Sequence, residues 1–147
     1  MNSIHYPEHT TRKNILGPWA KATALLVISL GLLWFSIDFP AFLLFKPQSA
    51  GWVLWFSYAK DLIQPFALYF FICLSERWLK NWQWRALIAF AIPTLLEIGQ
   101  GLYYQFSPSR YVGSFDPMDI VMYAMSVGLA ALIEQTILTK VFKFWSQ

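Results

Sequence analysis

The sequence predicts an all-α integral membrane protein, a single domain built as a bundle of four transmembrane helices with both termini in the cytoplasm. Of its 147 residues, 57% are hydrophobic and only 13% are charged, which leaves too little polar surface for a water-soluble globule. Four apolar segments each reach the length of about 17 to 25 residues that a helix needs to cross a bilayer. These segments are residues 20–37, 52–74, 86–104 and 117–138, joined by short connections.

The first segment follows a basic lead and therefore invites comparison with a signal peptide. That lead is long and contains Glu8, and the bulky Trp34 and Phe35 occupy the place of a small-residue cleavage site. We expect the segment to stay in the protein as its first helix. The second segment follows residues 38–51, whose conformation the sequence leaves open.

The distribution of basic residues predicts the orientation of the chain in the membrane. They gather before the first segment, between the second and third, and after the fourth, as Arg12, Lys13, Lys21, Arg77, Lys80, Arg85, Lys140 and Lys143. The opposite side has only Lys46 and Arg110 in its two connections. By the positive-inside rule, the richly basic side is cytoplasmic. The net charge of +3 therefore reflects membrane topology and not nucleic-acid binding.

Glu97 lies in the middle of the third segment, where a carboxylate costs on the order of 3 kcal/mol on insertion scales. Such a residue is kept where it faces a protected interior and has a function. Helical spacing and a rise of about 1.5 Å per residue bring other polar side chains to the same outer half of the bundle. The set comprises Asp61, Gln64, Glu97, Gln100, Arg110, Asp116, Asp119 and Tyr123.

Several of these residues also have simpler interpretations. Asp116 and Asp119 flank Pro117 as a helix start requires, with an acceptor at the N-cap and a carboxylate in the first turn. Asp61 is alternatively a partner for a neighbouring helix. Glu134, near the inner end of the fourth segment, is expected to pair with another helix or to reach the cytoplasmic interface.

The outer half holds more acidic than basic groups, with only Lys60 and Arg110 to offset its carboxylates. Lys60 is expected to extend toward the outer surface. Two explanations of the surplus stay open for Glu97: the carboxyl group is protonated at rest, or it meets a cationic group of a ligand.

The string from Pro93 to Gln100 with Glu97 between them, then Arg110, then Asp119, resembles the VanZ-like family of small bacterial membrane proteins. The resemblance covers mainly residues 91–130. Two positions depart from the family pattern, because Tyr123 stands where asparagine is common and Ser126 where glycine is expected. The chain thus resembles a divergent member of that family.

The resemblance implies a multi-pass protein of the bacterial cytoplasmic membrane, linked to low-level resistance to the glycopeptide antibiotic teicoplanin. It implies Glu97, Gln100, Arg110 and Asp119 as functional residues. We therefore expect the outer cluster to bind or handle a membrane lipid, a cell-envelope precursor or an amphiphilic antibiotic, with Asp61 contributing and no cofactor.

Two other classes of function stay open. One is a small proton-coupled exporter using Glu97, which would act as a homodimer because the chain has no inverted repeat. The other is a lipid-headgroup enzyme with a metal ion held by Asp61, Glu97 and Asp119. The sequence offers no catalytic group in support, since its two histidines, His5 and His9, lie in the predicted cytoplasmic tail.

Overall fold

In the computed structural model, every regular element of the described residues, 16–38, 41–106 and 116–142, is a helix. The long helices are α1 (Leu16–Asp38), α4 (Lys60–Cys73), α5 (Trp82–Phe106) and α6 (Pro117–Ile133). The short ones are α2 (Ala41–Leu44), α3 (Ala50–Leu54) and α7 (Thr139–Val141), with two π-helical segments, η1 (Trp55–Ala59) and η2 (Glu134–Leu138).

The predicted all-α membrane architecture is confirmed for three of its helices. Gly17–Ser36, Trp82–Tyr103 and Pro117–Val141 are long and apolar enough to cross a membrane. The second predicted span, residues 52–74, is also helical, because α3, η1 and α4 follow one another without a break from Ala50 to Cys73. This run is less apolar than the other three, since Lys60, Asp61 and Gln64 lie in it.

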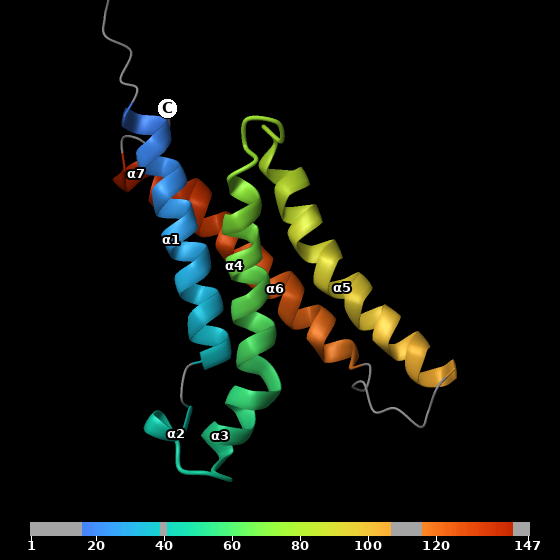
Figure 1. Cartoon of the computed structure of the whole chain (residues 1–147). Coiled ribbons are helices and arrows are strands. Elements are labelled where there is room, and N and C mark those ends of the chain that lie inside the picture. Colours follow the sequence, from blue (N-terminus) through green and yellow to red (C-terminus); the bar gives the residue numbers. More distant parts are fainter. Residues whose placement is uncertain (1–15, 39–40, 107–115, 143–147) are drawn as a thin grey trace, which may run out of the picture.

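The long helices run alternately up and down, so that their ends gather at two opposite ends of the bundle (Figure 1). The start of α1, the end of α4, the start of α5 and α7 lie together at the basic end, which holds Lys21, Arg77, Lys80, Arg85 and Lys140. The start of α4, the end of α5 and the start of α6 point to the opposite, acidic end, which holds Asp61, Glu97, Asp116 and Asp119.

Polar side chains mark where the helices begin. The Asn81 carboxamide oxygen accepts a hydrogen bond from the Gln83 amide at 2.9 Å, so α5 begins at Trp82, ahead of the predicted residue 86. Ser49 caps α3 by accepting from the Trp52 amide at 3.3 Å. Because α5 begins at Trp82, Arg85 lies inside a helix and not in the connection predicted between the second and third segments.

The core gathers around α4, which contacts α1, α5 and α6. Tyr69, Phe70 and Cys73 of α4 pack with Leu25 of α1, Ala89 of α5 and Val127, Ala130 and Ala131 of α6. The alanines let the helix backbones approach closely, as is typical of helix contacts in membranes. Ser126 adds a hydrogen bond from its hydroxyl to the Leu62 carbonyl, which joins α6 to α4.

Large apolar side chains cover the outward faces of the bundle. Leu30 of α1, Leu95 of α5 and Leu129 of α6 are 57%, 66% and 46% exposed, respectively. Such exposure would promote aggregation in water, whereas in a bilayer the same side chains contact lipid tails at no cost. The outer surface therefore agrees with the membrane assignment made from composition.

Candidate functional site

Three helices bring acidic side chains together toward the acidic end. Asp61 of α4, Glu97 of α5 and Asp119 of α6 are close enough for their charges to interact with one another. Tyr123, one turn after Asp119 on α6, is 6% exposed and interacts with all three carboxyl groups. We call these four residues the acidic cluster.

Local structure explains how these side chains reach a common place. Asp119 and Tyr123 are four residues apart and so share one face of α6. Asp61 is the second residue after η1, whose wider turns shift the face that α4 presents to its neighbours. Asp61, Glu97 and Asp119 are each only partly exposed.

Lys60 is the basic residue that acts on this cluster within the described part of the chain. Its charge interacts with the Asp61 carboxyl group and opposes the effect of the neighbouring acids. One ammonium group beside three carboxyl groups leaves the local balance negative. When its carboxyl groups are ionised, the cluster favours a positively charged partner.

The other residues that the sequence grouped with the cluster do not all join it. Gln64 and Gln100 are exposed, and no hydrogen bond links them to the cluster among the residues that the structure describes. Arg110 lies outside the described residues. Asp116 contributes its charge to Asp61 and Asp119 from an exposed position at the start of α6.

Asp116 has the simpler role that its sequence context allows. Its side chain accepts a hydrogen bond from the Met118 amide at 2.9 Å, with Pro117 as the first helical residue. The carboxylate thus caps α6, as the sequence pattern favours.

Removing this cap is expected to have a specific, modest cost. Asp116→Ala should lower the free energy of unfolding by about 1 kcal/mol, whereas Asp116→Asn should leave it nearly unchanged, because asparagine is an equally good N-cap. Denaturant unfolding of the purified variants, with hydrogen exchange at the Met118 amide, measures both effects. Equal destabilisation by alanine and asparagine would show that the negative charge, and not the acceptor, is what α6 requires.

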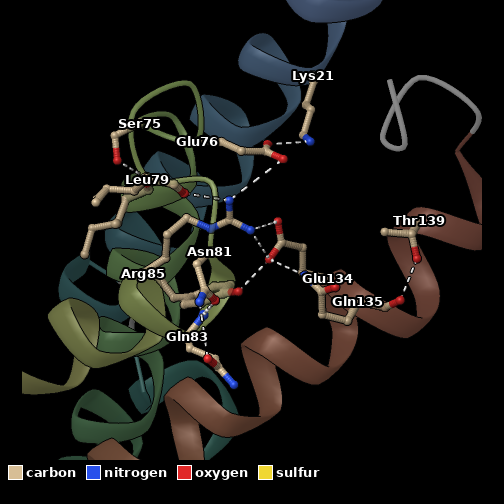
Figure 2. A network of polar contacts seen from close by, with 12 residues as sticks. Lys21, Ser75, Glu76, Leu79, Asn81, Gln83, Arg85, Glu134, Gln135 and Thr139 are labelled. Carbon is tan, nitrogen blue, oxygen red and sulfur yellow. Dashed lines mark hydrogen bonds and ion pairs between the residues drawn. The ribbon is translucent and has the colours of Figure 1, made fainter.

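A second cluster of polar side chains lies at the basic end (Figure 2). The sequence predicted a partner for only one of its members, Glu134. The Arg85 guanidinium donates to both carboxylate oxygens of Glu134, at 3.0 and 3.1 Å. The Tyr69 hydroxyl donates to the same carboxylate at 2.5 Å. Glu76 lies 3.8 Å from the other guanidinium nitrogen and 2.5 Å from the Lys21 ammonium. We call these five residues the basic-end network.

The two central charges of this network are almost entirely removed from solvent. The side chains of Arg85 and Glu134 are each 2% exposed, and they come from different helical segments, α5 and η2. A buried pair of this kind is compensated only when geometry and further hydrogen bonds are favourable. Here Arg85 Nη2 donates to both oxygens of the carboxylate and the Tyr69 hydroxyl donates to one of them. The Arg85 Nε has no partner among the described residues.

One contact of this network was predicted from the sequence. Glu134 does pair with a neighbouring helix, which is the first of the two alternatives expected for it. The prediction for Arg85 is wrong: the predicted helix starts at residue 86, whereas the Asn81 cap makes α5 start at Trp82. The predicted depth in the membrane could have indicated this ion pair. Arg85 and Glu134 are oppositely charged and lie at the same end of adjacent apolar segments.

No group of three or more histidine, cysteine, aspartate or glutamate side chains in residues 16–38, 41–106 and 116–142 is arranged to hold a metal ion. The metal-bound enzyme considered for Asp61, Glu97 and Asp119 thus gains no support from their placement.

The fold and its two polar groups define a small helical membrane protein with charged side chains held inside the bundle. Comparison with protein-family models, curated proteins and solved structures found no match to the chain.

Proposed function

We propose that the chain is a four-span protein of the bacterial cytoplasmic membrane, with both termini inside, that binds an amphiphile through the acidic cluster. The amphiphile is a lipid, an envelope precursor or a lipophilic antibiotic that presents a positively charged group. The single observation that supports this most strongly is that Asp61, Glu97 and Asp119, from three different helices, lie close enough for their charges to interact.

The charge of the cluster favours the class of ligand. Three carboxyl groups and the Tyr123 hydroxyl offer hydrogen-bond acceptors to an ammonium group, with Lys60 as the neighbouring cation. In a partly buried site, such charge-assisted contacts are stronger than neutral ones. Exposed apolar side chains of α5 and α6, such as Leu95, Leu102 and Val121, offer a surface to a lipid tail.

The resemblance of residues 91–130 to the VanZ-like family supports the same proposal. It implies Glu97, Gln100, Arg110 and Asp119 as site residues and an antibiotic or envelope amphiphile as ligand. Arg110, one residue of this set, would supply a complementary cation for a phosphate or carboxylate on a ligand of mixed charge.

Two ions of equal shape and opposite charge test the proposal. Purified protein in lipid nanodiscs is titrated with tetraphenylphosphonium and with tetraphenylborate, and empty nanodiscs correct for partitioning into lipid. We expect saturable binding of the cation at least about tenfold tighter than that of the anion, because one favourable charge contact in a partly buried site contributes about 1 to 4 kcal/mol. Equal affinity for the two ions would contradict the proposal.

A proton-coupled exporter would use the same cluster, and one further measurement separates it from a binding protein. In energised vesicles, an exporter moves tetraphenylphosphonium against its gradient, and an uncoupler abolishes that movement. A binding protein changes the bound amount without uncoupler-sensitive movement, which is the result we expect.

A further inference from the structure

A pocket of about 550 Å³ opens at the basic end, away from the acidic cluster. It lies between the first turns of α1 and the connection that follows α4. Its rim is basic, with Lys21, Arg77 and Lys80, and its apolar wall includes Leu25 and Leu74. The volume falls within the range of about 300 to 1,000 Å³ that is usual for small-molecule sites.

We propose that this pocket binds the headgroup of an anionic phospholipid from the leaflet that faces the basic end. Three basic side chains line it against one carboxylate, that of Glu76. Glu76 is itself held by Lys21 at 2.5 Å and by Arg85 at 3.8 Å, so its charge is already shared between two cations. Arg77 and Lys80 are exposed at the rim and supply the excess positive charge that a phosphate requires.

The surroundings select a lipid over a free anion. Lys21 is immediately followed by the apolar run of α1, and its side chain is only 13% exposed. A phosphate at the level of Lys21 therefore lies where water gives way to apolar side chains. Leu26, which follows Leu25 of the pocket wall on α1 and is 40% exposed, offers a surface for an attached acyl chain.

The site differs from a diffuse attraction of anionic lipid to a basic surface, because its cations surround one cavity. Lys140 provides the comparison: it is exposed and lies at the same end of the bundle, but it does not line the pocket. If the pocket is the binding site, Arg77 and Lys80 matter and Lys140 does not.

Native mass spectrometry of the full chain in mild detergent tests this inference. The protein is titrated with phosphatidylglycerol and with phosphatidylcholine of the same acyl chains, and separately with glycerol 3-phosphate. We expect phosphatidylglycerol to bind most tightly, and Arg77→Gln combined with Lys80→Gln to weaken it about thirtyfold, since each basic residue near an anionic lipid contributes about fivefold. Lys140→Gln should bind as the unaltered protein does.

Four outcomes would overturn the inference: equal binding of the two phospholipids, full binding by the double variant, an equal loss in Lys140→Gln, or binding of glycerol 3-phosphate as tight as that of the lipid. Both altered side chains are exposed, and a circular dichroism spectrum verifies that the helices are retained. The acidic cluster takes no part in this test, so its result is independent of the function proposed above.

Discussion

Arg85→Ala is expected to lower the free energy of unfolding by about 3 kcal/mol, because it leaves the buried Glu134 carboxylate without its charged partner. Both side chains are 2% exposed, and the guanidinium makes two of the hydrogen bonds that the carboxylate receives. Reversible unfolding in mixed detergent measures the loss. Arg77→Ala is the matched control, since Arg77 lies at the same end of the bundle but is exposed.

A double variant separates the pair from its individual members. Arg85→Met with Glu134→Leu removes both charges, and replacing a buried ion pair by apolar side chains of similar size is often neutral or stabilising. We therefore expect it to recover most of the stability that Arg85→Ala loses. If Arg85→Ala unfolds at the same denaturant concentration as Arg77→Ala, the basic-end network does not stabilise the bundle.

Glu97→Gln is expected to weaken binding of tetraphenylphosphonium about thirtyfold, because truncating one partner of a buried charge contact costs about 2 kcal/mol or more. Glutamine keeps the length and the polar oxygen of the side chain but removes its charge. The variant should fold normally, since losing one of several neighbouring acids relieves repulsion with Asp61 and Asp119.

Asp116→Asn is the matched control for this measurement. It also removes one negative charge from the acidic end, and the helix cap is preserved. Binding should fall only slightly in this variant, because Asp116 is exposed and acts on the cluster from a distance. Equal losses in Glu97→Gln and Asp116→Asn would mean that the general charge of this end attracts the cation and that Glu97 is not a site residue.

The sequence predicted the helical architecture from features that do not depend on tertiary contacts. Apolar length identified the three helices that are long and apolar enough to cross a membrane, and the Asp116-Pro117 pair identified the start of α6 to the residue. Helical spacing also placed Asp119 and Tyr123 on one face. These inferences succeed because each depends on neighbouring residues alone.

The details that depend on packing could not be obtained in this way. Whether Gln100 faces the cluster or the outside depends on the rotation of α5 about its axis, and the apolar residues that surround it do not fix that rotation. The π-helical segments, which begin at Trp55 and at Glu134, have no signal in the helical spacing of the sequence. The buried position of Arg85 required knowing which residue of α6 or η2 it would meet.

The most direct test of the account is to find where a cationic amphiphile binds. A photoreactive analogue of tetraphenylphosphonium is irradiated with the full chain in nanodiscs, and the labelled peptides are identified by mass spectrometry. The account predicts labels near Asp61, Glu97 and Tyr123 that excess tetraphenylphosphonium removes. Labels spread over the lipid-facing surfaces of α1 and α5, or unaffected by the competitor, would contradict it.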